Sequence, residues 1–217
     1  MIHVLVVDDH PVVRKGLAQI IGAEPSMKVV GEASNAGAVL DLLDKEIVHV
    51  VCLDVNLPGK SGVELLPEIK GRFPRLPVLI LSQYPERQMA VRAIQAGAAG
   101  YLTKDAAPEE LVNAIKRLSE GKRYVTAEGA ELLAEKVGNP IGKPHESLSN
   151  RELRVFTMIA SGQQVGSIAD TLNLSPKTVS TYRTRVLEKL GLRSTGELIR
   201  YALENGITLD GEAGQSN

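Results

Sequence analysis

The stretch His49-Val50-Val51-Cys52-Leu53-Asp54-Val55-Asn56-Leu57-Pro58-Gly59 decides the fold of the first half of this chain. Its apolar run is rich in valine and does not alternate with polar residues, which is typical of a strand buried on both faces of a parallel sheet. Pro58-Gly59 ends the run as a turn. Asp54 therefore lies at the carboxyl end of a central strand, where open α/β sheets place their ligands. Because burying a carboxylate is costly, Asp54 is a candidate functional residue.

Further apolar runs alternate with helical patterns on both sides of this stretch, up to about residue 122. Five strands alternating with five helices predict right-handed crossovers and a doubly wound parallel sheet. We expect the flavodoxin-like strand order 2-1-3-4-5, with the second strand at an edge. Ser61 is the expected N-cap of the third helix. The predicted strands are residues 2–7, 28–33, 48–54, 77–82 and 99–103, and the predicted helices are residues 11–22, 36–45, 61–73, 87–95 and 108–120.

The pattern changes after residue 122. One helix is expected at residues 127–137, and the Gly/Pro-rich stretch after it predicts a linker. No strand pattern follows this linker, and residues 149–206 predict four helices, the first of them capped by Ser149 together with Glu152. The sequence therefore predicts an α/β domain at 1–122, a linker at 123–147, an all-α domain at 148–210 and a disordered tail at 211–217.

The overall composition is that of a globular protein of 217 residues, with 43% apolar and 24% charged residues and a net charge of −1. Cys52 is the only cysteine, which excludes intrachain disulfides and a cysteine-based zinc site. No apolar stretch approaches the roughly 18 residues that span a bilayer, and the N-terminus lacks the pattern of a signal peptide. We expect a cytoplasmic protein without a membrane partner.

Acidic residues follow two strands that are adjacent in the predicted sheet: Asp8 and Asp9 after the first, Asp54 after the third. Converging carboxylates repel and raise one another's pKa values unless a cation lies among them, and an oxygen-only ligand set suits Mg²⁺. Ser82 and Lys104 end two further strands at the same edge. A hydroxyl and an ammonium facing such a site are what phosphoryl transfer to a carboxylate needs. Taken alone, an Asp-Asp pair is more often a turn or helix cap, so the specificity lies in the whole set.

Residues 167–191 contain a helix-turn-helix pattern. A short apolar helix meets a turn at Asn173, and Ser175-Pro176 then begins a second helix as its N-cap and first residue. Between residues 177 and 193, five basic residues accompany the single acid Glu188, which is the local surplus expected for phosphate contacts. Read alone, the same segment could be a solvated helix face that is basic by chance.

Residues 1–120 resemble the receiver domain of bacterial response regulators, in the motifs Val-Val-Asp8-Asp9-His10, Leu53-Asp54-Val-Asn-Leu-Pro58-Gly59, Leu81-Ser82 and Gly100-Tyr101-Leu-Thr-Lys104-Asp105-Ala106. The resemblance implies that Asp54 accepts a phosphoryl group from a sensor histidine kinase or a small phosphodonor. It also implies a Mg²⁺ site formed by Asp9, Asp54 and the backbone carbonyl of Asn56, with Asp8 acting mainly through water and charge. Ser82 and Tyr101 match the switch pair of the family, and Lys104 matches the residue that ion-pairs the acyl phosphate.

Residues 145–210 resemble the LuxR-type DNA-binding domain, in Leu148-Ser-Asn-Arg-Glu152, Ile168-Ala169, Leu172, Lys177-Thr-Val179 and Lys189-Leu190. The resemblance implies that the second helix of the pair enters the major groove of double-stranded DNA. It implies base-facing positions at Ser180, Thr181 and Thr184, and further DNA-binding residues at Lys177, Thr178, Arg183, Arg185 and Lys189. It implies a homodimer through the last helix, at Glu197, Leu198, Tyr201 and Ala202. Where the family carries a polar run before Ile168, this chain has Val165-Gly166-Ser167, which we expect to weaken the start of that helix.

The two resemblances together are those of the NarL/FixJ class of response regulators. They imply a phosphorylation-controlled transcription regulator that dimerises on activation and is not an enzyme. A haloacid-dehalogenase-like phosphatase is one rival, but it needs a second acid where Asn56 stands. Another rival keeps the receiver and makes the helical domain a protein-interaction module. No Gly-x-Gly-x-x-Gly follows any predicted strand, which argues against a Rossmann enzyme.

Overall fold

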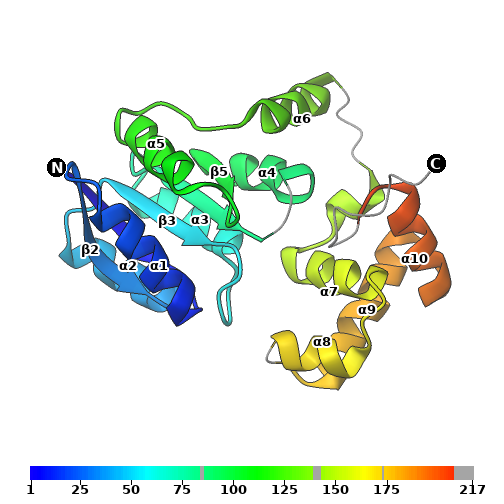
Figure 1. The fold of residues 1–217 in the computed structure, drawn as a ribbon. Helices are drawn as coiled ribbons and strands as arrows, with labels where there is room; N and C mark the ends of the chain where they lie inside the picture. The colour runs from blue at the N-terminus through cyan, green and yellow to red at the C-terminus, as the bar shows by residue number, and fades with distance from the viewer. Residues whose placement is uncertain (84–85, 139–142, 173, 208–217) are drawn as a thin grey trace. The chain divides into compact units, whose positions relative to one another are not determined.

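A computed structural model describes residues 1–83, 86–138, 143–172 and 174–207 of the chain (Figure 1). The predicted tail at 211–217, the predicted turn residue Asn173 and residues 139–142 of the Gly/Pro-rich stretch lie outside these residues. The chain folds as two compact units, Met1–Gly138 and Asn139–Asn217. Among the described residues, no helix combines the length and the apolar character that crossing a bilayer requires.

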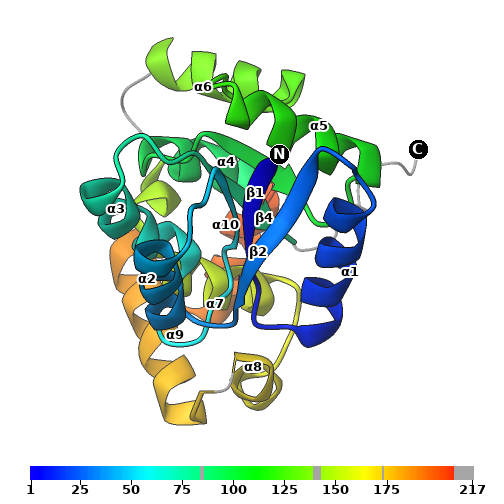
Figure 2. The ribbon, with the colours of Figure 1, turned by 90° about the vertical axis from the view of Figure 1, so that its left-hand side faces the viewer.

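The first unit is a five-stranded parallel sheet with the order β2-β1-β3-β4-β5, which confirms the predicted fold class and strand order. Figure 2 shows α1 and α5 on one side of the sheet and α2 and α3 on the other. The strands are β1 (Ile2–Val7), β2 (Met27–Ala33), β3 (Val50–Asp54), β4 (Val78–Ser82) and β5 (Gly100–Thr103). The helices are α1 (Pro11–Gly22), α2 (Ala36–Lys45), α3 (Gly62–Arg72), α4 (Glu86–Gln95), α5 (Pro108–Ser119) and α6 (Ala127–Gly138).

Every residue of β3 and of β4 is buried, because helices cover both faces of the centre of the sheet. This is the physical reason for the continuous apolar run before Asp54. The edge strand β2 is only partly buried, in agreement with its weaker sequence signal. Ser61 caps α3 as predicted, and Glu64 completes a capping box there.

Packing of the first unit continues past the boundary at residue 122 drawn from the sequence. The Tyr124 amide donates to the Ala99 carbonyl (3.1 Å), and the Tyr101 amide donates to the Tyr124 carbonyl (3.3 Å). Gly100 permits this approach, since a Cβ there would lie 2.8 Å from the Tyr124 carbonyl oxygen. The helix α6, which the sequence assigned to the linker, contacts α4 and groups with the first unit.

The second unit is helical, as predicted, with η1 (Pro144–Ser147), α7 (Asn150–Ala160), α8 (Val165–Leu172), α9 (Pro176–Leu190) and α10 (Thr195–Glu204). Ser149 and Glu152 form the predicted capping box of α7. Ser175 caps α9, and the helix ends at Gly191 in the left-handed region (φ 67°). The helix α8 forms from Val165 onward with Gly166 inside it, so the expected weakness does not move its start. The buried core includes Phe156, Ile168, Val179, Val186, Leu198 and Ala202.

Candidate functional site

Asp54 is the last residue of β3 and is fully buried. Its Oδ2 lies 2.9 Å from Nζ of Lys104, yet neither carboxylate oxygen accepts a hydrogen bond of normal geometry from the described residues. Burial raises the pKa of the Asp54 carboxyl, the Lys104 ammonium lowers it, and the charge of Asp8 raises it further. Repulsion among the carboxylates is the cause expected from the sequence, whereas in the structure the loss of hydration raises the pKa of Asp54 more.

Lys104 links the two buried carboxylates at this edge of the sheet. Its ammonium donates a hydrogen bond to Oδ2 of Asp8 (2.6 Å) in addition to its ion pair with Asp54. The Lys104 amide donates to the carbonyl of Ser82 (2.7 Å), which fixes the start of the loop after β5. The side chain is only 10% exposed, so water screens these charges weakly. The structure therefore brings together three of the residues that the sequence predicted to converge.

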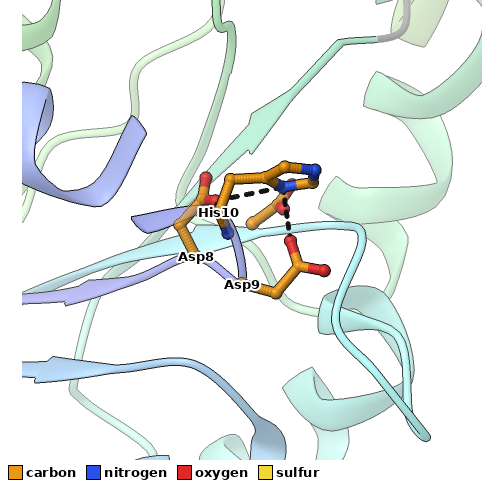
Figure 3. A group of neighbouring side chains, drawn as sticks. Asp8, Asp9 and His10 are labelled. Carbon is orange, nitrogen blue, oxygen red and sulfur yellow. Dashed lines mark hydrogen bonds and ion pairs between the residues drawn. The ribbon is translucent and has the colours of Figure 1, made fainter. Parts of the chain in front are cut away.

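Asp8, Asp9 and His10 form the other wall of the pocket (Figure 3). The His10 amide donates to Oδ1 of Asp8 (2.8 Å), and Nδ1 of His10 lies 2.6 Å from Oδ1 of Asp9. These three residues and Asp54 each offer one ligand atom within 4.8 Å of the others. The side chain of His10 is exposed and lies at the rim of this group of ligand atoms.

The donor set fits a hard divalent cation. Both Asp54 oxygens, Oδ1 of Asp9 and the side-chain oxygen of Asn56 are buried atoms without a hydrogen-bond partner among the described residues. Buried carboxylate oxygens left without donors are costly unless a cation coordinates them. Oxygen ligands at a shallow sheet edge suit Mg²⁺, which retains several waters.

Two residues that support the pocket were not identified from the sequence. Gly62 opens α3 directly against β3, where a Cβ would lie 2.0 Å from the carbonyl oxygen of Asp54. Arg14, on α1, donates to the backbone carbonyl of Asp8 (2.8 Å) and also to Glu32 (3.0 Å). Neither residue has a local sequence signal, because each contact joins two different elements. Gly62 begins α3 and meets the end of β3, and Arg14 of α1 meets the end of β1 and the strand β2.

The predicted switch residues lie on the two strands next to β3. Ser82 ends β4 and is fully buried. Tyr101 lies on β5, paired with Ile80, and its side chain is also fully buried, more than expected for an aromatic residue of an outer strand. The hydroxyl of Ser82 and the ammonium of Lys104 thus come from adjacent strand ends at the edge that holds Asp54.

The helix α9 carries the predicted DNA-contacting residues. Its buried stripe is Val179, Val186 and Leu190, and the opposite side is exposed. The hydroxyls of Thr181 and Thr184 donate to backbone carbonyls one turn earlier (3.0 and 3.1 Å). Both side chains are exposed, and because their hydroxyl hydrogens are already used, each oxygen can act toward a ligand only as a hydrogen-bond acceptor. The exposed members of the predicted set are Lys177, Thr181, Thr184, Arg185 and Lys189, and the half-buried members are Thr178, Ser180 and Arg183.

Lys189 has a partner inside its own unit. Its ammonium lies 2.7 Å from Oε2 of Glu152, whose side chain is 4% exposed, so the pair ties α9 to α7. The Nε atom of Arg183 is likewise buried, and it has no hydrogen-bond partner among the described residues. The ammonium of Lys189 is therefore less available to a phosphate backbone than its sequence position implied.

Two of the four residues predicted for dimerisation are buried within their own unit. Leu198 and Ala202 are fully buried in the core of their own unit, because they lie on the stripe of α10 that packs inward. The hydroxyl of Tyr201 bonds Nδ1 of His145 (3.0 Å), and its ring packs against Phe156. Glu197 accepts from the Arg193 amide (2.7 Å). The same helix exposes Leu203, at 63%.

Comparison with known proteins identifies the family. Residues 4–116 match the response regulator receiver domain, and residues 146–202 match the LuxR family of bacterial regulatory proteins. The response regulator UvrY of Escherichia coli (strain K12) is 39% identical over 209 residues, covering 95% of this chain and 96% of that protein. This chain is a LuxR-family response regulator. The response regulator GacA of Pseudomonas aeruginosa is 41% identical over 209 residues, covering 95% of this response regulator and 98% of GacA.

Solved structures of RcsB have the same two-part architecture as this response regulator. One from Salmonella typhimurium has a TM-score of 0.57 at 29% identity and covers 93% of this chain and 98% of its own. RcsB from Salmonella enterica serovar Typhimurium bound to promoter rprA with the phosphomimetic BeF3⁻ has a TM-score of 0.61 at 27% identity, covering 92% and 97%. Members of this family regulate transcription by binding DNA and are not enzymes, and their receiver domains bind Mg²⁺ at the acidic pocket.

Proposed function

We propose that Asp54 accepts a phosphoryl group from a sensor histidine kinase in a Mg²⁺-dependent reaction, and that this controls DNA binding by the second unit. The observation that carries the proposal is the environment of Asp54. Its buried carboxylate accepts no hydrogen bond of normal geometry from the described residues and lies 2.9 Å from a lysine ammonium, among three other possible ligands. Such a group is a nucleophile held ready rather than a structural cap.

The transfer begins with an oxygen of Asp54. This oxygen attacks phosphorus, the bond from phosphorus to the kinase imidazole nitrogen breaks, and the electron pair stays on that nitrogen. A bound Mg²⁺ would offset charge on the phosphoryl oxygens; its ligands would be Asp9, Asp54 and the carbonyl of Asn56, with Asp8 acting through water and charge. Once Asp54 is esterified it loses its negative charge, so the Lys104 ammonium is drawn to the phosphoryl oxygens instead.

The switch then spreads through the neighbouring strands. The added phosphoryl group brings a charge of about −1.5 to −2 and new acceptor oxygens, which attract the hydroxyl of Ser82 at the end of β4. Tyr101 lies on the adjoining strand and packs inside the sheet edge, so movement at Ser82 alters its packing. The surface formed by α4, β5 and α5 is the bistable element that this pair biases.

The output is binding of double-stranded DNA by α9. The exposed cations Lys177 and Arg185 suit phosphates, and the acceptor hydroxyls of Thr181 and Thr184, with Ser180, face the bases. Phosphorylation promotes a homodimer, so that two copies of α9 read a two-fold site. RcsB, a structural neighbour, has been solved as two dimers bound to two parallel DNAs. Because its target is bacterial DNA, we place this response regulator in the cytoplasm.

The test is intact-mass analysis after treatment with acetyl phosphate and Mg²⁺, with wild type beside Asp54→Ala. We expect one phosphoryl adduct on the wild type and none on the variant, and no adduct on the wild type when Mg²⁺ is chelated. Beryllofluoride should then raise both the dimer fraction and the affinity for promoter DNA. An adduct that persists in Asp54→Ala, or DNA affinity indifferent to beryllofluoride, would refute the proposal.

A further inference from the structure

A second cavity lies at the opposite end of the sheet from Asp54. Its volume is about 1040 Å³, and it is lined by residues at the amino ends of the strands, among them Ile2, His49, Pro77 and Ala99. The N-terminus of the chain marks this end of the sheet in Figure 1. Parallel strands carry Asp54 to the other edge, so the cavity shares no lining residue with the acidic pocket.

The charged residues of this cavity are all basic. Lys70, Arg75, Lys122 and Arg123 line it together with His49, and its lining contains no aspartate or glutamate. Lys122 pairs with Glu120 (2.7 Å). Within the described part of the chain, Lys70, Arg75 and Arg123 have no carboxylate within ion-pair distance. On a chain of net charge −1, this is a local concentration of positive charge rather than a general property.

Lys70 and Arg123 both line the cavity. The Lys70 ammonium donates to the carbonyls of Pro74 (3.2 Å) and Leu76 (2.8 Å), which anchor it at the cavity wall. Burial lowers the pKa of Lys70, and the positive charge of Arg123 lowers it further. Cations that line one cavity with no carboxylate in the lining repel one another, so an anion bound in the cavity relieves an unfavourable interaction already present in the fold.

The rest of the lining is apolar. Ile2, Val48, Phe73, Leu76 and Leu118 contribute to it, so a cationic wall adjoins a hydrophobic floor. A cavity of this size and mixed character fits a small organic ligand, since such sites measure roughly 300–1,000 Å³ and combine apolar walls with a few charged groups. Guanidinium groups bind the oxygens of phosphates and carboxylates in a two-pronged geometry, and several cations lining one cavity favour a ligand that carries several negative charges, such as a polyphosphate.

We propose that this basal cavity binds a nucleoside polyphosphate, with its phosphates at Lys70, Arg75 and Arg123 and its base on the apolar floor. The concave shape favours a small ligand over duplex DNA, because the phosphates of a duplex lie on a broad convex surface. This site does not depend on Asp54 or on Mg²⁺. If the cavity binds no nucleotide, the proposal that Asp54 is phosphorylated is therefore unaffected.

Binding is tested with the full-length protein and a fluorescent methylanthraniloyl-GTP, with EDTA present so that the acidic pocket cannot recruit phosphates through Mg²⁺. Unlabelled GTP, ATP, guanosine and inorganic phosphate serve as competitors. Arg123→Glu and Arg75→Glu reverse one charge each in the cavity. Lys15→Glu makes the same change on exposed α1, outside the cavity, and is the matched control. A cooperative urea unfolding transition with a midpoint near that of wild type shows that each variant is folded.

We expect saturable binding with a Kd below about 1 mM, competed by GTP or ATP at least tenfold better than by guanosine. Each cavity variant should weaken binding by about tenfold, as for loss of a charged hydrogen bond, and Lys15→Glu by less than about twofold. Absence of saturable binding, equal losses in all three variants, or undiminished binding by Arg123→Glu overturns the proposal. A loss of DNA affinity in Arg123→Glu without nucleotide binding also overturns it, and assigns the surface to DNA.

Discussion

Replacing Gly62 with alanine perturbs the contact between α3 and the phospho-acceptor strand by one methyl group. The new Cβ would lie 2.0 Å from the Asp54 carbonyl oxygen and 3.1 Å from Cγ of Leu53. Non-bonded carbon and oxygen atoms do not approach closer than about 3 Å, so the backbone must move by roughly 1 Å. The obstructing atom belongs to the backbone of a fully buried strand, which cannot give way as a flexible side chain does. We expect destabilisation of about 3 kcal/mol, at the upper end of overpacking in a core.

Gly71→Ala is the matched control, since Gly71 lies in the same helix with nothing within 4 Å of its Cβ position. Alanine there should stabilise the protein by about 0.5–1 kcal/mol through helix propensity. Urea unfolding of both variants measures the difference. The displaced Asp54 should also slow phosphorylation by acetyl phosphate in Gly62→Ala, about tenfold or more, while Gly71→Ala retains the wild-type rate. A Gly62→Ala protein as stable and as rapidly phosphorylated as wild type would refute this account of the packing.

Three further predictions concern charged groups. The pKa of Asp54 is raised in the folded state, so its ionisation costs stability as pH rises above the ordinary value of 3.8. Asp54→Asn should therefore unfold at higher urea than wild type at pH 7, with the gap closing as pH falls toward about 4; an equal gap at both pH values contradicts this. Lys104→Met leaves two buried carboxylates without their cation and should cost about 3 kcal/mol in urea without Mg²⁺, partly restored by the metal; wild-type stability would count against it. Lys189→Met should lower unfolding free energy by about 1 kcal/mol through the loss of its pair with Glu152, with an unchanged salt dependence of DNA binding. Arg185→Ala should instead lower the slope of log affinity against log salt by about one at unchanged stability, and the reverse pattern would show that the two roles are exchanged.

Local sequence signals determined the elements of this response regulator. Continuous apolar runs such as the one before Asp54 are typical of strands covered on both faces, and the structure buries β3 throughout. Helix starts were predicted from capping chemistry at Ser61, Ser149 and Ser175, because a cap involves only residues within one turn. The alternation of strands and helices leaves few topologies open but does not fix the strand order, and the structure confirms the order that was expected.

Only the tertiary structure shows which of the candidate site residues contact one another and how burial changes their pKa values. Lys104 bonds Asp8 across 96 residues, and only closure of the sheet sets that distance. The main cause of the raised Asp54 pKa is burial, which depends on how completely the neighbouring elements exclude water.

The sequence also did not show which surface covers the apolar side of α10. Leu198 and Ala202 fit either a dimer face or a domain core, because an apolar stripe records that a helix is covered but not which partner covers it. Lys189 looked equally suited to DNA until the fold placed Glu152 beside it. Caps and strands can be predicted from the sequence because they depend on residues that are neighbours in the chain. Contacts between distant residues depend on packing geometry that one or two residues do not encode.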